Sequence, residues 1–140
     1  MSKDPSSWID YLDNRLALNN IFGGEVPALD KLVLAQFVLD AGAMYISLNF
    51  PSLPSGSPAR WIARGCDSAQ LRLSFHSLFE ISMTGTWEEA PDVVASFHSD
   101  KCFSMSNPEF NVRFKYEHVN ADLYPYNSDI FEEPRDWYHR

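Results

Sequence analysis

Cysteine is scarce in this chain of 140 residues, which has only Cys66 and Cys102. Neither belongs to a CxxC motif or stands at a spacing typical of zinc ligands, so the cysteines do not indicate a structural metal. Nothing in their spacing forces them to pair either. We therefore expect two free thiols in a reducing cytosol.

Long apolar segments are also lacking. No stretch approaches the run of about 20 apolar residues that a membrane-spanning helix needs. The first residues, MSKDPSSW, have neither the basic region nor the apolar region of a secretory signal. We expect a cytoplasmic protein that does not insert into a membrane.

Basic residues are outnumbered, because 19 Asp and Glu stand against 11 Lys and Arg, which gives a formal net charge of −8. Nucleic acid is a polyanion and would be repelled by a domain of this charge, so we expect no nucleic-acid partner. The same charge suits a basic protein partner. Acidity also keeps cytosolic proteins soluble, so the charge alone excludes nucleic acid and selects nothing else.

Catalytic motifs are missing as well. The sequence has no GxSxG motif and no Gly-rich phosphate loop. Glu88 and Glu89 beside Trp87 resemble a glycosidase carboxylate near an aromatic platform, but the sequence marks out no second acid. Three histidines fall on predicted polar strand faces without HxH or HxxxH spacing: His76, His98 and His118. We predict a protein that is not an enzyme and has no metal or cofactor.

The hydrophobic content, 45% with 14% aromatic residues, is ample for a packed core. A chain of this length usually forms one domain that buries about two-thirds of its unfolded surface. We therefore expect a single domain over residues 1–140. Within it, residues 127–140 should form an acidic and aromatic tail that is mobile or lies along the surface.

Residues 69–83, AQLRLSFHSLFEISM, have the clearest β pattern in the chain. Apolar and polar residues alternate up to His76, and the alternation resumes after Ser77 and Leu78. Two runs so close together favour an antiparallel hairpin, which we predict to be central in the sheet. Six side chains are expected to be buried: Leu71, Leu73, Phe75, Ile81, Val112 and Phe114.

The whole chain predicts a mainly β (α+β) fold, with an antiparallel meander sheet or sandwich of about eight strands and one N-terminal helix. The helix is expected over residues 5–22, where Trp8, Leu12 and Leu16 lie four residues apart. Residues 29–40 are apolar on both faces, which is typical of a central strand. Residues 51–60, rich in proline and serine, predict a loop. Further strands are expected over residues 44–50, 93–98, 101–106, 110–117 and 119–124.

Several short motifs occur in an order that resembles the immunity protein 50 family of bacterial polymorphic toxin systems. They span about residues 8–126 and are Trp8, IFGG (21–24), PAL (27–29), PARW (58–61), the strand pair that ends in Gly85 before Trp87, and LYPY (123–126). We interpret the motif residues as fold-defining. The tryptophans would then be packing residues and the glycines turn residues.

The resemblance implies a cytosolic binding protein without catalytic residues, which neutralises a toxin encoded beside it. The acidity fits a basic toxin such as a nuclease, because an acidic plug suits a basic substrate groove and speeds association. Two alternatives stay open. A small-molecule-binding or enzymatic β-domain would show a deep, polar-lined cavity. A structural subunit of a larger assembly would show a large exposed apolar patch.

Two stretches, residues 87–92 and residues 129–137, combine aromatic and acidic residues. Aromatic side chains supply contact area, and carboxylates pair with the lysines and arginines of a basic toxin. The competing interpretation is that Trp87 packs under its loop and the acids are merely solvated. The predicted toxin-binding residues are Trp87, Glu88, Glu89, Asp92, Asp129, Glu132, Glu133, Asp136 and Trp137. The next candidate is a polar sheet face with Arg72, Ser74, Arg113 and Lys115.

The cysteine interpretation predicts that reductant has no effect on stability. Because no disulfide is expected between Cys66 and Cys102, the melting temperature should be the same with and without dithiothreitol. Differential scanning calorimetry measures this directly. A decrease of several degrees in reductant would instead indicate a disulfide.

Overall fold

The computed structural model describes residues 5–22, 26–53, 57–87 and 91–127. These residues form a 3-10 helix, two α-helices and eight strands: η1 (Pro5–Tyr11), α1 (Arg15–Phe22), β1 (Leu32–Asp40), β2 (Ala43–Asn49), α2 (Ala59–Ala63), β3 (Ser68–His76), β4 (Phe79–Gly85), β5 (Asp92–His98), β6 (Cys102–Ser106), β7 (Phe110–Lys115) and β8 (His118–Tyr126). The short helix α2 begins inside the segment that was predicted to be a loop.

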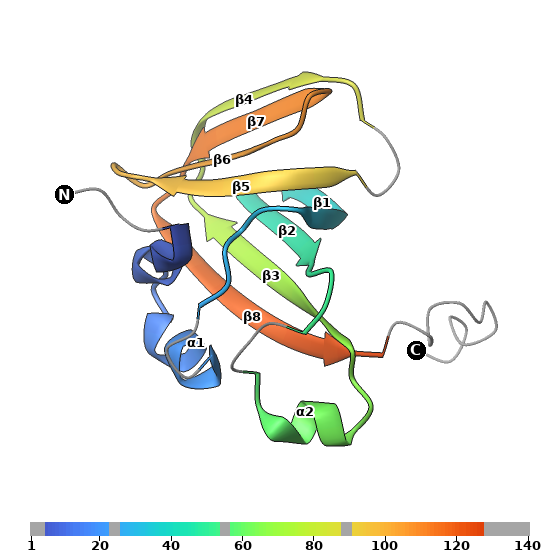
Figure 1. Cartoon of the computed structure of the whole chain (residues 1–140). Helices are drawn as coiled ribbons and strands as arrows, with labels where there is room; N and C mark the ends of the chain where they lie inside the picture. The colour runs from blue at the N-terminus through green and yellow to red at the C-terminus, as the bar shows by residue number, and fades with distance from the viewer. Residues whose placement is uncertain (1–4, 23–25, 54–56, 88–90, 128–140) are drawn as a thin grey trace.

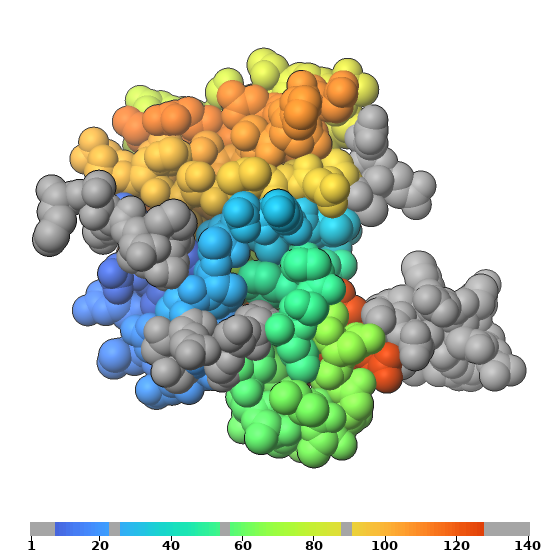
Figure 2. Space-filling view, viewed as in Figure 1, coloured from blue at the N-terminus to red at the C-terminus, as the bar shows by residue number. Residues whose placement is uncertain are grey.

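The strands form one antiparallel sheet in the order β4-β7-β6-β5-β1-β2-β3-β8. Strands β1 and β5 join through only two residue pairs, Leu32 with Val93 and Val33 with Asp92. The sheet therefore divides into two halves, β1-β2-β3-β8 and β5-β6-β7-β4, which lie one above the other (Figure 1). In the space-filling view the two halves are in contact (Figure 2). The predicted mainly β, antiparallel fold class is confirmed.

The predicted hairpin over residues 69–83 is wrong. Strand β3 pairs with β2 and β8, whereas β4 pairs with β7 at the far edge of the sheet. The two strands instead follow one bent path, and β8 and β7 run antiparallel beside them. His76 lies opposite His118, and Phe79 lies opposite Lys115, so the pairing keeps its register through the bend. We call these four strands the bent ribbon.

The bend has a backbone cause. Ser77 and Glu80 adopt left-handed conformations, with φ of 58° and 53°, and a bulge separates Phe79 from Ser82. Bends and bulges of this kind let a strand pass from one packed sheet to another. A break in alternation at Ser77 and Leu78 is common to a hairpin turn and to such a corner. Sequence alternation therefore located both strands correctly but could not distinguish the two arrangements.

The core lies between the two halves and centres on Phe75 at the end of β3. Its ring centroid is 4.8 Å from that of Phe103, 4.9 Å from that of Phe114 and 5.1 Å from that of Tyr116. Five of the six predicted core residues are buried: Leu71, Leu73, Phe75, Val112 and Phe114. The sixth prediction, Ile81, is wrong. Its side chain is 40% exposed because β4 is an edge strand.

A bulge explains why β1 seemed apolar on both faces. The register of β1 against β2 shifts between Leu34 and Gln36. The shift changes which alternate residues face the core, so Leu34 before the bulge and Phe37 after it both pack against the buried cluster. Gln36 and the alternate residues that follow it are left on the outer face. The position of β1 between β5 and β2 agrees with the prediction of a central strand.

The predicted N-terminal helix is present as two pieces, η1 and α1. Trp8 is buried, and its Nε1 donates a hydrogen bond to the carbonyl of Pro27 at 2.7 Å. The interruption between the pieces changes the helical phase, so Leu16 is 74% exposed while Leu18 and Phe22 are buried. Among the described residues, no helix is long and apolar enough to cross a membrane.

The segment between η1 and α1 covers the outer edge of β8. Asp13 receives a hydrogen bond from the N–H of Val119 at 3.1 Å, and its own N–H donates to the Val119 carbonyl at 2.8 Å. The Asn14 side chain makes the same two-way contact with Ala121, at 3.0 and 2.7 Å. These four bonds satisfy backbone groups that an open edge would leave unpaired.

Phe75 is buried at the centre of the core and Ile81 is exposed at the edge, so replacing each by alanine should change the free energy of unfolding by different amounts. Phe75→Ala should lower the free energy of unfolding by about 2–5 kcal/mol, through lost burial and the cavity left behind. Ile81→Ala, at the exposed edge, should cost less than about 1 kcal/mol. Chemical denaturation of both variants checks this. Equal losses would contradict the placement of the core.

Tyr116 predicts a second, pH-dependent effect. Its burial raises the pKa of the phenol to about 12, from an ordinary value of 10.0. Between these pH values the unfolded chain has lost the proton while the folded protein keeps it, so the free energy of unfolding falls as pH rises. The wild type should lose about 2–3 kcal/mol more than Tyr116→Phe between pH 9 and 12. Urea denaturation at each pH measures the free energy of unfolding. If it falls by the same amount in the wild type and in Tyr116→Phe, the prediction is wrong.

Candidate partner-binding surface

The outer face of the half β1-β2-β3-β8 presents polar side chains in cross-strand rows. Successive residues of a strand point to opposite faces, so the residues between the core positions all lie on this face. The antiparallel register aligns them in rows across the four strands. Three of the rows are Gln36-Ser47-Arg72-Asp122, Val38-Tyr45-Ser74-Asn120 and Asp40-Ala43-His76-His118.

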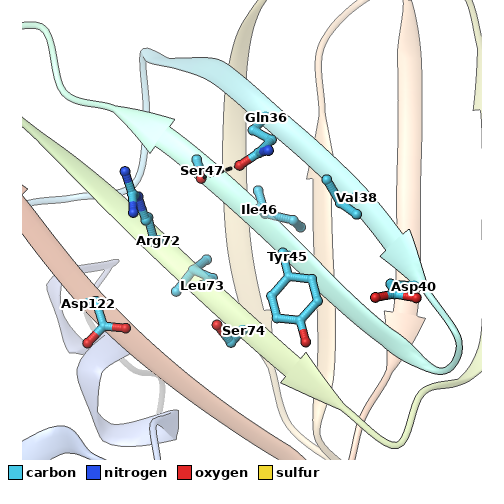
Figure 3. A pocket seen from close by; sticks show the side chains of 10 residues that line it. All are labelled: Gln36, Val38, Asp40, Tyr45, Ile46, Ser47, Arg72, Leu73, Ser74 and Asp122. Carbon is cyan, nitrogen blue, oxygen red and sulfur yellow. Dashed lines mark hydrogen bonds between the residues drawn. The ribbon is translucent and has the colours of Figure 1, made fainter. Parts of the chain in front are cut away.

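An open hollow of about 330 Å³ lies on this face (Figure 3). We call it the outer hollow, and its lining consists of Gln36, Val38, Asp40, Tyr45, Ile46, Ser47, Arg72, Leu73, Ser74 and Asp122. The Ser47 side chain is only 4% exposed. Its Oγ lies 3.5 Å from Oε1 of Gln36, well beyond the usual hydroxyl hydrogen-bond distance of about 2.7 Å. This hydroxyl therefore keeps capacity for a closer partner.

Arg72 is held at one side of the outer hollow. Its Nε donates to Oε1 of Gln70 at 2.7 Å, and its guanidinium lies 4.1 Å from the centre of the Tyr124 ring. In Figure 3 the guanidinium points away from Asp122, its neighbour on β8. Within the described residues, neither Asp122 nor Asp40 forms an ion pair with a cation. The hollow thus contains two carboxylates that have no ion pair with any cation of the described residues.

The three histidines singled out in the sequence, His76, His98 and His118, do not form one cluster. His76 and His118 lie opposite each other at the end of β3 and β8, and Nδ1 of His118 is 3.4 Å from Oδ2 of Asp13. His98 is on β5 in the other half, where its Nε2 lies 2.7 Å from the hydroxyl of Ser104. The part of the chain that the structure describes contains no group of three His, Cys, Asp or Glu residues that could hold a metal.

Two of the predicted toxin-binding residues, Trp87 and Asp92, lie among the described residues, and both are exposed. The Trp87 ring stacks on Phe110 with centroids 4.2 Å apart and contacts Phe37 at 5.2 Å. Since Phe37 is the core-facing neighbour of Gln36, Trp87 and the outer hollow lie on opposite sides of β1. The other predicted residues lie outside the described ranges: Glu88, Glu89, Asp129, Glu132, Glu133, Asp136 and Trp137.

The second predicted surface is not a single face. Arg72 and Ser74 line the outer hollow, whereas Arg113 and Lys115 are on β7 in the other half of the sheet. Lys115 is also engaged, because its Nζ is 3.0 Å from Oε2 of Glu80. This contact raises the pKa of the Lys115 ammonium group, through the hydrogen bond first and the opposite charge second.

Strand β4 forms an edge of the sheet and carries three exposed apolar residues. Phe79, Ile81 and Met83 are each 40–43% exposed. After them Gly85 has φ of 116°, and a Cβ there would collide with the carbonyl oxygen of Glu109 on the way into β7. Gly85 is thus required for the close approach of two strands and is not a turn residue as predicted.

The fold and these surfaces define a mainly β protein whose polar outer face is built on four adjacent strands. A family model described as immunity protein 50 matches residues 14–122. The chain therefore belongs to the immunity protein 50 family, as its motifs indicated. No curated protein and no solved structure matches the chain.

Proposed function

We propose that this protein binds a cognate bacterial toxin in the cytoplasm and neutralises it by direct protein–protein contact, without catalysing a reaction. Membership of an immunity protein family, from the match over residues 14–122, is the observation that carries this proposal. The polar outer face supports it, because strands hold these side chains in a fixed arrangement and a rigid surface loses little entropy on binding.

The partner that we propose is basic, for example a nuclease. The net charge of −8 would attract such a toxin and raise the rate of encounter. The proposed contacts remain residues 87–92 and 129–137. Trp87 supports this placement, because its ring is 43% exposed while Phe110 and Phe37 restrict its motion. Half-exposed, immobilised aromatics are typical anchors of protein interfaces.

The small-molecule alternative finds less support in the interior. Among the described residues, the buried side chains are those of hydrophobic residues apart from Ser47 and Ser68, and Trp8, Trp61 and Tyr116 add two indole N–H groups and one phenol hydroxyl. Ser68 is satisfied by a 2.7 Å hydrogen bond to the carbonyl of Phe50. The outer hollow is polar, but it opens on the surface of the sheet. An open hollow of this kind suits a protruding side chain better than an enclosed ligand.

Direct neutralisation is tested with the purified toxin domain encoded beside the gene. Adding increasing amounts of the protein should abolish toxin activity at a fixed molar ratio, and the two should elute together from a size-exclusion column. An active toxin in the presence of excess protein, with no shared peak, would overturn the proposed function.

Charge placement gives a sharper prediction. Changing Glu88, Glu89, Glu132 and Glu133 together to lysine should slow association with the toxin at low salt, because carboxylates that steer a basic partner are replaced by repelling cations. Stopped-flow or surface plasmon resonance at low and high salt measures the rates. The difference from the wild type should shrink at high salt, where charges are screened.

A matched control separates placement from net charge. Lysine at four exposed acids elsewhere, Asp10, Asp30, Asp100 and Glu117, changes the net charge by the same amount. This variant should slow association less than the first one. Equal slowing by both variants would mean that residues 87–92 and 129–137 are not a preferred contact, and circular dichroism confirms that both variants fold.

A further inference from the structure

We propose that the toxin docks an apolar segment on one open side of the protein, between the strands β1 and β4. We call this side the open seam, and its exposed apolar residues are Leu39, Ile81, Met83 and Trp87. This inference rests on the proposed function and adds where the contact lies and which chemistry it needs on the toxin. It depends on the way in which the two halves of the sheet meet.

The two halves are joined at two corners, which leaves two open sides. One corner is the bend of the bent ribbon, and the other is the short pairing of β1 with β5. The first open side, beside β8 and β5, is covered by the N-terminal segment, since Tyr11 stacks on Phe97 at 5.7 Å and Asp13 binds the edge of β8. The second open side lies between β1 and β4, and the helices η1 and α1 pack away from it, on β5 and β8.

Two contacts fix the position of β1 beside β4. At one end, the N–H of Leu78 donates to the carbonyl of Gly42 at 3.1 Å, so the turn after β1 lies next to the start of β4. At the other end, the Trp87 ring, just after β4, contacts Phe37 of β1 with centroids 5.2 Å apart. Strand β1 pairs with β2 and β5, and β4 pairs with β7, so the two strands do not pair with each other. Side chains, and not backbone hydrogen bonds, therefore fill the space between them.

The side chains of the open seam belong to the core-facing sides of their strands. Leu39 is two residues after Phe37, which packs against the buried cluster, and alternation puts both on the same face of β1. Met83 lies opposite the buried Val112 of β7, so it too is on the core-facing side. The open seam is thus a margin of the core, at which the core reaches the surface.

Exposure along the open seam is unusual for core-facing side chains. Its four apolar residues are 40–47% exposed. They are brought together by two strands, whereas exposed large apolar residues elsewhere are on separate elements: Leu16 on α1, Ile62 on α2 and Val94 on β5. A contiguous group of exposed apolar side chains on a globular protein marks an interaction site.

The charge around the open seam favours the basic toxin as the occupant. Protein interfaces typically have an apolar centre and a polar rim. Here the rim carries acids, because Asp40 ends β1 and Asp92 lies beside the start of β1, and both are exposed. Lysines and arginines of the toxin would meet this rim while its apolar side chains cover the centre. Trp87 belongs both to the open seam and to the proposed contact over residues 87–92, so the two form one continuous surface.

The first test measures dissociation from the toxin. The double variant Leu39→Ser, Met83→Ser removes apolar contact area from both strands of the open seam. It should dissociate at least about tenfold faster than the wild type, because most effects of interface mutations are in the dissociation rate. Surface plasmon resonance at high salt, where charges are screened, measures this rate.

A matched control carries the same kind of change elsewhere. The double variant Leu16→Ser, Val94→Ser removes two apolar side chains that are at least as exposed, and it should change the dissociation rate less than about twofold. Urea denaturation shows whether both double variants are folded. An unchanged rate for Leu39→Ser, Met83→Ser, or equal acceleration by both variants, would overturn the open seam as the contact and leave the proposed function standing.

The second test uses the wild type and needs no toxin. N-acetyl-leucine amide is the probe, and N-acetyl-serine amide is the matched polar control. Titration into isotope-labelled protein, followed by NMR, should shift the signals of residues 37–39, 81–83 and 87 with the leucine amide and not with the serine amide. Equal shifts with both amides, or shifts confined to other residues, would overturn the proposal. If the wild type binds no toxin, the proposed function fails, and this titration still decides whether the open seam accepts an apolar guest.

Sedimentation velocity of the free protein tests the other occupant, a second copy of the chain. We expect no self-association that depends on the open seam. Self-association of the wild type that is lost in Leu39→Ser, Met83→Ser would assign the open seam to a second copy and overturn its assignment to the toxin.

Discussion

The continuous pairing of the bent ribbon is the constraint on which the rest of the structure depends. Its register continues from His76 and His118 in one half of the sheet to Phe79 and Lys115 in the other, so the two halves are fastened along one corner. At that corner Phe75 reaches across to the rings of Phe103 and Phe114. The backbone bend and the aromatic core therefore act at the same corner, while the short pairing of β1 with β5 joins the two halves a second time.

The positions of the strands were predictable from the sequence. A strand buried on one face has apolar and polar residues in alternation, and this pattern can be read from a few neighbouring residues. Five of the six expected core residues met that expectation, and Ile81 did not, because alternation records the side of a strand and not its neighbours. The hairpin prediction failed because alternation also does not show which strands pair with each other. The left-handed backbone at Ser77 makes a corner between the two halves of the sheet, and not a hairpin turn. Propensity did carry a signal against the hairpin, because tight hairpin turns favour glycine, asparagine or aspartate, and Ser77 and Leu78 are none of these.

The outer hollow could not have been predicted from the sequence. Asp40, Arg72 and Asp122 are far apart along the chain, and only the register of three strand pairs brings them to one face. The bulge between Leu34 and Gln36 is also essential, because it turns Gln36, Val38 and Asp40 outward. The composition showed that acidic residues are abundant. It could not show which of their carboxylates form an ion pair with a lysine or arginine and which do not.

Alternation along the strands also separates the side chains that build the core from those on the polar outer face. Three of the motif residues that carry the family resemblance are structural: Trp8 and Trp61 are buried, and Gly85 permits the approach of β7 to β4, whereas Trp87 is 43% exposed. The polar residues that line the hollow lie on β1, β2, β3 and β8, on the face opposite to the core, where a change of side chain leaves the core packing intact. A surface of this kind can be altered one residue at a time while the bent ribbon and its aromatic cluster stay unchanged, which would suit the partner-specific binding proposed above.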